Sequence, residues 1–523
     1  MKKHTNIIVA LVFVTMVTSC KKSFDSLYQN PNKPSSVPAS LLLNGVLNDM
    51  YDAPYTMKER WCQYYCCNYD YYGNNRYDFG SGDNYFSTLK NVTKMEEEAL
   101  NSGLPEVNPY RAMANFFKAY FFTQMSFQMG DIPMTQALQG LTNLTPVYDA
   151  QKDVFLQAFK WLDSANAEMG SLISAGNLSM AGDIYFNNDL SKWQKAINTY
   201  RIRLLIELSK KADDADLNIK QQFASIINDP TTYPVMQSLD DNLRYTYVYP
   251  TNYYPMNPGN FGFDALRYNT SATYVGLLTK FNDPRVFVTS EPAGALVAAG
   301  KSPTDFSAFV GANPGEDLGA MYIEANSGEY SLINRKHYYD TYTGEPSIQI
   351  GYPELCFDIA EAIDRGWISS GPLGSAEDYY KAGILASWAY YSIPSTGSMS
   401  VYFLHPGASL GTYDTYSVDV NFDTYYNQAA VKYAGGITGL TQILQQRYLA
   451  LFRHSGLESY YTWRRTGVPT FTTGPGTGNS ERIAMRFQYP SSEQTANTEN
   501  YNDALQSQYS GNDDINGIMW LLK

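Results

Sequence analysis

The stretch 109–138, PYRAMANFFKAYFFTQMSFQMGDIPMTQAL, decides the fold class of this 523-residue chain. Over 110–128 its apolar side chains recur three and four residues apart, at Met113, Phe117, Tyr120, Phe121 and Phe127. That spacing is typical of one face of an α-helix. Gly130 and Pro133 follow, and both residue types commonly end helices. The stretch therefore predicts an amphipathic helix that packs one face against a core.

The same periodicity recurs on both sides of this helix. It predicts further helices over 40–50, 153–169, 191–211, 355–365, 376–391, 441–452 and 457–465. The first of these would be capped by Ser40. Helices of this length joined by short turns are typical of tetratricopeptide arrays, although no strict consensus repeats here. Between 233 and 355 the chain changes to Pro, Gly, Asn and Tyr-rich loops with short strand-like pieces such as 244–249. We therefore expect a mostly α fold, an irregular tetratricopeptide-like helical repeat scaffold with long loop excursions and a few short strands.

The N-terminal residues have the pattern of an export signal. Lys2, Lys3 and His4 precede an apolar-type run over 7–17, which is about half the length that spans a bilayer. We interpret 1–19 as a signal peptide. The small residues before Cys20 resemble the lipobox of bacterial lipoproteins, which implies acylation of Cys20; a secreted protein with an incidental cysteine is the alternative. The proline-rich stretch that follows makes 20–38 a lipidated cysteine and tether, and we expect 39–523 to form a single α-rich domain.

Composition excludes several classes of protein. A chain that is 44% hydrophobic and 15% aromatic is too apolar for intrinsic disorder. A formal net charge of -13 argues against nucleic acid as a partner, because phosphate binding needs a basic surface. Cys62, Cys66 and Cys67 have no histidine near them in sequence, so we interpret them as buried thiols on a helix, with disulfide pairing left open. We expect no metal site and no cofactor. We interpret the acidic pairs at 213–214 and 513–514 as solvated, with weak calcium binding as the alternative.

Four strings together resemble one known family. They are 109–138, 352–367 (YPELCFDIAEAIDRGW), 446–471 (QRYLALFRHSGLESYYTWRRTGVPTF) and 486–501 (RFQYPSSEQTANTENY). Within them stand a Gly-Asp-x-Pro turn at 130–133, an Ala-Glu-Ala helix at 360–362, an Arg-Arg-Thr-Gly-x-Pro turn at 464–469 and Tyr-Pro-x-x-Glu at 489–493. In this order they resemble the SusD/RagB nutrient-binding outer-membrane lipoproteins.

The resemblance implies a cell-surface location on the outer membrane through a lipid anchor. It also implies a SusC-like TonB-dependent barrel transporter as partner and, usually, an oligosaccharide as ligand. The motif residues Arg464, Arg465, Glu361 and Glu493 are expected to form structural salt bridges or caps.

Tyrosine supplies what a glycan-binding surface needs, namely a flat apolar ring and a polar edge. The chain has 45 tyrosines, and many gather in two clusters, 61–86 and 245–268. From these clusters we predict the ligand-binding residues Trp61, Tyr64, Tyr65, Tyr71, Tyr72, Asn75, Arg76, Tyr77, Tyr249, Asn252, Tyr253 and Tyr254. The family's ligand contacts do not align reliably with these residues, and many of the tyrosines could instead be packing.

Catalysis is not expected. The pattern G-x-S-x-G at 407–411 follows a strand-like piece, but no helix follows the serine as a nucleophile elbow requires. The glycine-rich stretch 474–478 contains Pro475 and predicts a turn-rich loop, not a phosphate cradle. A surface glycoside hydrolase is the alternative, because 51 acidic residues always include some suitable pair. A peptide-binding member of the same family is the other.

Overall fold

The structure is a computed structural model that describes residues 36–177, 179–452 and 454–523. The expected signal peptide at 1–19, the expected lipidation site Cys20 and nearly all of the expected tether lie outside the described residues. Within the described part of the chain, no helix combines the length and the apolar character needed to cross a membrane.

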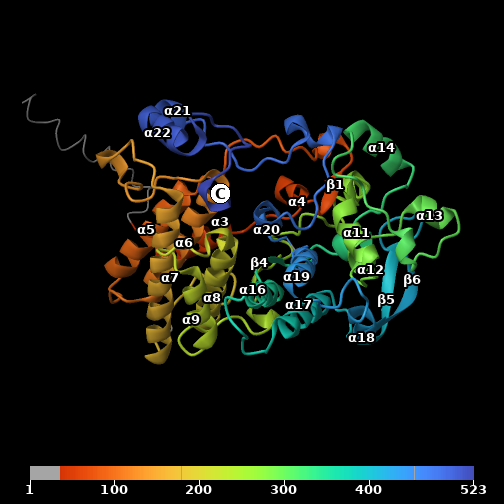
Figure 1. Ribbon diagram of the computed structural model, residues 1–523, viewed down its shortest axis with the longest axis horizontal. Coiled ribbons are helices and arrows are strands. Elements are labelled where there is room, and N and C mark those ends of the chain that lie inside the picture. Colours follow the sequence, from red (N-terminus) through yellow and green to blue (C-terminus); the bar gives the residue numbers. More distant parts are fainter. Residues whose placement is uncertain (1–35, 178, 453) are drawn as a thin grey trace, which may run out of the picture.

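A scaffold of helices that are consecutive in sequence forms one side of the molecule, on the left of Figure 1. Each of these helices packs against the next. They are α5 (Phe86–Asn101), α6 (Pro109–Met129), α7 (Gln151–Ser174), α8 (Leu190–Glu207) and α9 (Ile219–Asn228). Before them come α3 (Ala39–Asp49), which packs against α5, and the short α4 (Met57–Trp61).

A second group of helices continues the scaffold after the long excursion. Its members are α16 (Tyr352–Asp364), α17 (Ala376–Tyr390), α19 (Gly436–Ala450) and α20 (Glu458–Thr466). α16 contacts α17, α19 and also α8, so the two groups share one core. The chain ends with α21 (Glu493–Ala496) and α22 (Thr498–Tyr509). The predicted mostly α, helical repeat scaffold is confirmed.

The helix α6 lies at the centre of the first group and is more buried than its pattern predicted. Asn108 caps it by accepting a hydrogen bond from the amide of Arg111 at 3.1 Å, and Pro109 occupies the first turn. It ends at Gly130, whose φ of +97° favours glycine. Only Arg111, Lys118 and Gln124 are partly exposed. The expected amphipathic character is therefore wrong, because α5 and α7 pack against it and its few polar side chains are buried with it.

Two local predictions are corrected. The helix α3 begins at Ala39 with Pro38 in the capping position, so Ser40 is inside the helix and is not its cap. The cysteines at 62, 66 and 67 do not share a helix, since Cys62 directly follows α4 and the other two belong to a strand. All four described cysteines are buried free thiols. Burial raises the pKa of Cys356 to about 12, as expected for an inert structural thiol.

The strands are few and pair only two by two. β1 (Tyr65–Cys67) pairs antiparallel with β3 (Tyr268–Thr270), and β2 (Leu243–Tyr245) pairs with β4 (Ser347–Ile350). β5 (Thr396–Leu404) and β6 (Tyr413–Asn421) form a nine-residue hairpin at the right of Figure 1. The excursion between α9 and α16 carries only short helices: α10 (Phe261–Asp264), α11 (Ala272–Lys280), α12 (Val286–Thr289), α13 (Gly294–Ala298), α14 (Leu318–Asn326) and α15 (Arg335–Tyr339); α18 (Phe422–Tyr426) follows β6.

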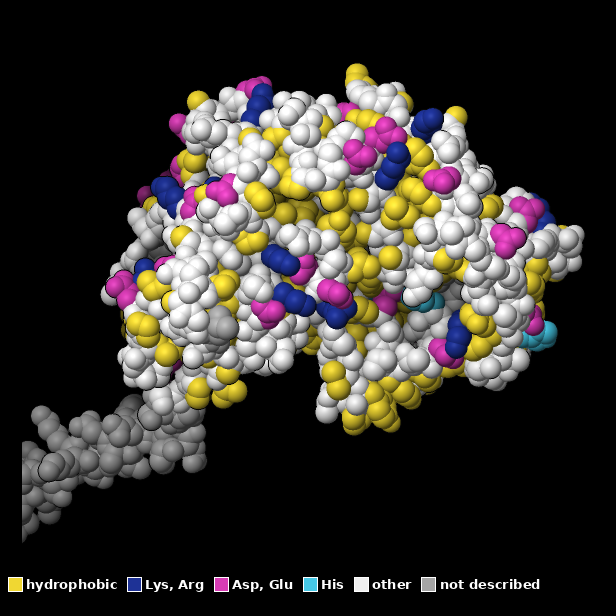
Figure 2. Space-filling model, turned by 90° about the horizontal axis from the view of Figure 1, so that it is seen from below, with side chains coloured by type: hydrophobic (Ala, Val, Ile, Leu, Met, Phe, Trp, Pro, Cys, Tyr) yellow, Lys and Arg dark blue, Asp and Glu magenta, His cyan; other side chains and the backbone are white. Residues whose placement is uncertain are grey.

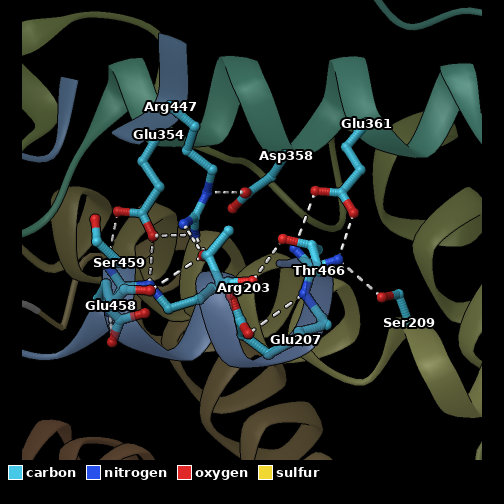
Figure 3. A network of polar contacts seen from close by, with 12 residues as sticks. Arg203, Glu207, Ser209, Glu354, Asp358, Glu361, Arg447, Glu458, Ser459 and Thr466 are labelled. Carbon is cyan, nitrogen blue, oxygen red and sulfur yellow. Dashed lines mark hydrogen bonds and ion pairs between the residues drawn. The ribbon is translucent and has the colours of Figure 1, made fainter. Parts of the chain in front are cut away.

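A buried network of charges joins the two helix groups (Figure 3). Arg203 of α8 makes a bidentate contact with Glu354 of α16, with both N···O distances 2.7 Å. Arg447 of α19 bonds Asp358 at 2.8 Å and Glu354 at 3.1 Å. Arg465 of α20 pairs with Glu361 of α16. Charge-assisted hydrogen bonds thus join α16 to α8, α19 and α20, which are distant from it in sequence.

The motif residues in this network are structural, as expected. Burial alone would raise the pKa of Glu361, but the guanidinium of Arg465 outweighs burial and lowers it to about 2. Arg464 lies outside the network and donates to the carbonyls of Phe127 and Met485. Glu493 accepts a hydrogen bond from the hydroxyl of Tyr148 at 2.9 Å.

Removing one arginine of the network tests how much the network contributes to the stability of the fold. We predict that Arg447→Met destabilises the fold by about 3–5 kcal/mol, because it leaves Asp358 buried without its cation and removes one of the cations that face Glu354. Urea unfolding followed by circular dichroism measures this. The control is Lys220→Met, which breaks an exposed pair with Asp213 and should change the unfolding midpoint little. Equal effects of the two substitutions would contradict the prediction.

Candidate ligand-binding surface

Most of the well-exposed aromatic side chains of the described residues come from the two predicted tyrosine clusters. There are seven of them, and six belong to the two predicted tyrosine clusters or contact them: Tyr69, Tyr71, Tyr249, Tyr253, Phe263 and Tyr322. Only Tyr402 of β5 lies elsewhere. Large apolar groups in water are costly unless a partner covers them. This concentration therefore marks a candidate ligand-binding surface.

Three rings form the first part of this surface, which we name the Tyr249 platform. Tyr249 and Tyr253 stack with ring centroids 5.5 Å apart, and Tyr342 lies 4.9 and 5.2 Å from them. Tyr249 is 57% exposed. The three rings offer a contiguous aromatic face with hydroxyl groups at its edge.

A tight turn presents these rings. The amides of Val248 and Asn252 each donate to the other residue's carbonyl, at 2.8 and 2.7 Å, so the chain reverses between Tyr249 and Tyr253. The side chain of Asn252 donates to the hydroxyl of Tyr245 at 3.2 Å. Asn252 is half-buried and holds the turn to the protein.

Tyr254 anchors the same turn from below and is fully buried. Its amide donates to the carbonyl of Tyr342 at 2.9 Å, which brings the third ring of the platform to the other two. The backbone of Gly344 approaches the Tyr254 ring so closely that a Cβ there would lie 2.2 Å from it, and its φ is +48°. Only glycine fits this contact without displacement.

A second group of rings, which we name the Tyr71 platform, comes from the first cluster. Tyr71 is 83% exposed and meets Tyr72 edge to face at 5.1 Å. Tyr69 lies 5.4 Å from Tyr322, and the guanidinium of Arg267 lies 4.9 Å from the Tyr69 ring. This platform therefore combines exposed aromatic faces with a cation beside them.

One loop connects the two platforms. The hydroxyl of Tyr72 donates to the carbonyl of Phe263 at 2.6 Å, and Phe263 is itself 71% exposed. A few residues earlier, Gly259 approaches the Tyr342 ring of the other platform. The structure thus brings parts of the clusters 61–86 and 245–268 together, so that both could contribute to one ligand-binding surface.

Several predicted ligand residues are instead part of the core, and these predictions are corrected. Tyr64, Tyr65, Tyr77 and Tyr254 are buried, and the hydroxyl of each makes a hydrogen bond within the protein. Asn75 is also buried, and its amide group bonds the backbone of Cys67 in both directions. Their rings and amides face packing partners, so they present no surface to a ligand.

The other predicted residues lie at or near the surface. Trp61 is half-buried, packs on Phe79 at 4.4 Å and donates to the carbonyl of Arg76, so it supports the loop. Arg76 is exposed and pairs with Asp78 at 2.6 Å. Tyr71, Tyr72, Tyr249 and Tyr253 carry the platforms.

Four platform residues are not among the predicted ligand residues. Tyr69 and Arg267 lie within the two predicted clusters, whereas Tyr342 and Tyr322 lie outside them. Tyr342 stands close after the run His337-Tyr338-Tyr339, which shares the Tyr-rich character of the excursion and could have drawn attention to it. Tyr322 is isolated in α14, and no local pattern distinguishes it. Their approach to the clusters depends on tertiary contacts.

A buried charge cluster lies directly under the Tyr249 platform. The ring nitrogens of His454 contact Glu59 at 2.5 Å, the Tyr254 hydroxyl at 2.7 Å and Glu345 at 3.1 Å. Burial would lower the pKa of His454, but the carboxylates of Glu59 and Glu345 outweigh it and raise that pKa to about 9. The imidazole is therefore cationic at neutral pH and holds Tyr254 in place.

The remaining motifs lie in turns and in an ion pair. The G-x-S-x-G pattern forms the turn between β5 and β6, with no helix after the serine. The stretch 474–478 is a turn ending in a single 3-10 turn. Among the described residues, no three His, Cys, Asp or Glu side chains are placed to hold a metal ion. Asp513 of the C-terminal acidic pair bonds Arg486 at 2.6 Å.

An apolar cavity of about 340 Å³ lies apart from all predicted ligand residues. It opens among α9, α16 and α17, and its lining includes Ile226, Tyr233, Leu355 and Cys356. Figure 2 shows hydrophobic side chains gathered in a hollow near the middle of the face seen from below. The lining of the 340 Å³ cavity offers few polar groups, unlike a site built for sugar hydroxyls.

Comparison with known structures agrees with the fold. A SusD homologue from Bacteroides fragilis is 30% identical with a TM-score of 0.79, over 93% of this chain and 100% of that one. An outer-membrane protein from Bacteroides vulgatus, described as involved in nutrient binding, is 29% identical with a TM-score of 0.77 over the same shares. A chitin-binding SusD homologue from Flavobacterium johnsoniae shares the fold, with 20% identity and a TM-score of 0.68 over 92% of this chain and 98% of that one.

The fold is therefore that of SusD homologues. The profile of a SusD-like family described as "starch-binding associating with outer membrane" matches residues 31–490. The chain belongs to this family, and the sequence resemblance is confirmed. A search of curated proteins gives no match.

The cluster under the platform predicts a pH-dependent stability. Because the pKa of His454 is raised from 6.5 to about 9, its contribution is complete below about pH 6.5 and is lost as the pH rises through 9. We expect wild type to exceed His454→Gln in unfolding free energy by an amount that falls by about 3 kcal/mol across this range. Urea titrations from pH 6 to 10 measure it.

The control is His405→Gln, which removes an exposed histidine paired with Asp414. It should leave the pH profile close to wild type. A His454→Gln profile that runs parallel to wild type at all pH values would contradict the assigned cation.

Proposed function

We propose that this protein is a cell-surface nutrient-binding lipoprotein that captures a glycan on the Tyr249 and Tyr71 platforms. It passes the glycan unchanged to a SusC-like TonB-dependent transporter. The observation that carries this proposal is that six of the seven well-exposed aromatic rings of the described residues belong to, or lie beside, two platforms that one loop connects. Aromatic faces match the apolar faces of sugar rings, and tyrosine hydroxyls match their edges.

The family membership supports the same ligand class. The family is described as starch-binding, and a relative with the same fold is a chitin-binding protein. Starch and chitin are both polysaccharides, so we propose a glycan as the class of ligand. The particular sugar is left to experiment.

Residues 1–19, 20–38 and 39–523 divide the chain into a signal peptide, a lipidated tether and a single binding domain in this proposal. The described domain starts at the end of the tether, where α3 packs against α5. A chain acylated at Cys20 would anchor stably, because several acyl chains on one residue act together.

Substitution of platform rings should weaken glycan binding. We predict that Tyr249→Ala, Tyr253→Ala and Tyr71→Ala each raise the Kd for a bound oligosaccharide about 2- to 12-fold, from about 0.5–1.5 kcal/mol of stacking per ring. Isothermal titration of the chain without residues 1–35 against a panel of starch and chitin oligosaccharides measures this. The matched control is Tyr402→Ala, an exposed tyrosine of β5 outside the platforms.

Two outcomes of that panel would contradict the proposal. Shortened products after incubation would identify a glycoside hydrolase, and affinity for peptides alone would identify a peptide-binding protein. Unchanged affinity in all three variants would remove the platforms from the site.

The anchor is tested separately. We predict that Cys20→Ala leaves the protein in the soluble fraction of cells, whereas Cys356→Ala, the substitution of a buried thiol, leaves it with the membrane. Fractionation followed by immunoblotting measures this. A Cys20→Ala protein that stays with the outer membrane would refute the lipid anchor.

A further inference from the structure

The strand β6 has one open edge. It pairs with β5 along all nine residues, without an interruption of the register. The sheet has only these two strands, and among the described residues no backbone hydrogen bond joins 413–421 to any segment other than β5. A row of backbone N–H and C=O groups therefore faces outward along β6.

Natural proteins usually protect such an edge with lysine, proline or a bulge. The strand β6 has none of these. Its only charges are Asp414 and Asp419, and Asp423 follows in α18. No lysine or arginine occurs anywhere from 382 to 431. The edge is long, regular and acidic.

A groove runs beside this edge. It has a volume of about 560 Å³ and is lined by four consecutive residues of β6, 418–421. Side chains of consecutive strand residues point to opposite faces, so a groove that touches all four follows the edge of the strand. No residue of β5 lines it, whereas 398–402 of β5 line a separate cavity. The groove is therefore on the open side.

The opposite wall of the groove is aromatic. Phe287, Phe306 and Trp388 contribute to this wall. An apolar side chain inserted into the groove would pack against these rings.

We propose that β6 binds an extended peptide segment of another protein by strand addition. The segment pairs with the open edge, inserts an apolar side chain into the groove and places a lysine or arginine near Asp419. Backbone N–H and C=O groups at strand spacing are complementary to an extended peptide, and an adjacent pocket for alternate side chains is typical of this mode.

A second copy of this chain is a poorer occupant. Antiparallel self-pairing of β6 along its full length would set Asp414 opposite Val420 and Asp419 opposite Thr415. It would bring four aspartates into one small sheet with no lysine or arginine in the strands to neutralise them. A basic partner segment satisfies the same carboxylates. This proposal does not depend on glycan binding, because no residue of either platform lines the groove.

The probe is the synthetic peptide acetyl-KVTVKFTVK-amide, tested against the protein without residues 1–35 by fluorescence anisotropy. The controls are two peptides of the same sequence in which every second backbone amide is N-methylated. One carries the methyl groups at the odd positions and the other at the even positions, so that each peptide loses the hydrogen-bond donors along one of its two edges. We expect the parent peptide to bind and at least one methylated register to bind tenfold more weakly. Hydrogen exchange of 414–420 should slow in the parent complex.

Charge reversal tests the partner's chemistry. Asp419→Lys should weaken the parent peptide at least fivefold and improve binding of the matched peptide with glutamate in place of lysine. Asp503→Lys, an exposed acid on α22, is the control and should change neither. Circular dichroism checks that both variants fold.

Three results would overturn the proposal. They are equal binding of the parent peptide and both methylated peptides, unchanged exchange in 414–420, or protection of 414–420 that depends on protein concentration without peptide. The last would assign the edge to self-association. Glycan affinity measured on the same samples separates this failure from a failure of the glycan-binding proposal.

Discussion

Three buried arginines, Arg203, Arg447 and Arg465, connect helices that are far apart in sequence, and the rest of the architecture depends on them. Their partners include Glu354, Asp358 and Glu361, three carboxylates on a single helix, α16. Burial raises the pKa of Asp358, and so does its crowding with Glu354 and Glu361, although Arg447 opposes both. The site therefore tolerates only one arrangement of these helices, because any shift leaves charge buried without a partner.

Such a network adds specificity more than net stability. Apolar residues of similar volume can hold helices equally well, whereas paired charges fix their register. The first helix group and the second are separated by the long excursion over 229–351. With α8 and α16 joined through Arg203 and Glu354, that excursion has fixed ends, and its loops can carry ligand-facing rings on a stable base.

In the candidate ligand-binding surface too, buried charged groups hold other parts of the structure in place. The exposed rings of Tyr249 and Tyr253 are held by Tyr254 beneath them, and Tyr254 is held by a cationic His454 between two carboxylates. Ordering exposed rings in advance lowers the entropy that binding would otherwise cost. A buried tyrosine next to an exposed one is thus part of the same site, although only the exposed one can touch a ligand.

Periodicity and motif order determined the fold class from the sequence alone. The apolar spacing of 110–128 marks α6 because helix geometry places residues three and four apart on one face, and the motifs at 130–133, 360–362, 464–469 and 489–493 indicated the family. The two tyrosine clusters also located the chain regions of the surface. Tertiary structure alone decided which tyrosines are exposed. Tyr71 and Tyr77 have the same chemistry and stand six residues apart, but Tyr77 is covered by packing with Phe79, while nothing in the described structure covers Tyr71 to a similar degree. Burial is set by long-range contacts, and for that reason Tyr322 belongs to a platform without any local signal and Tyr342 with only a weak one.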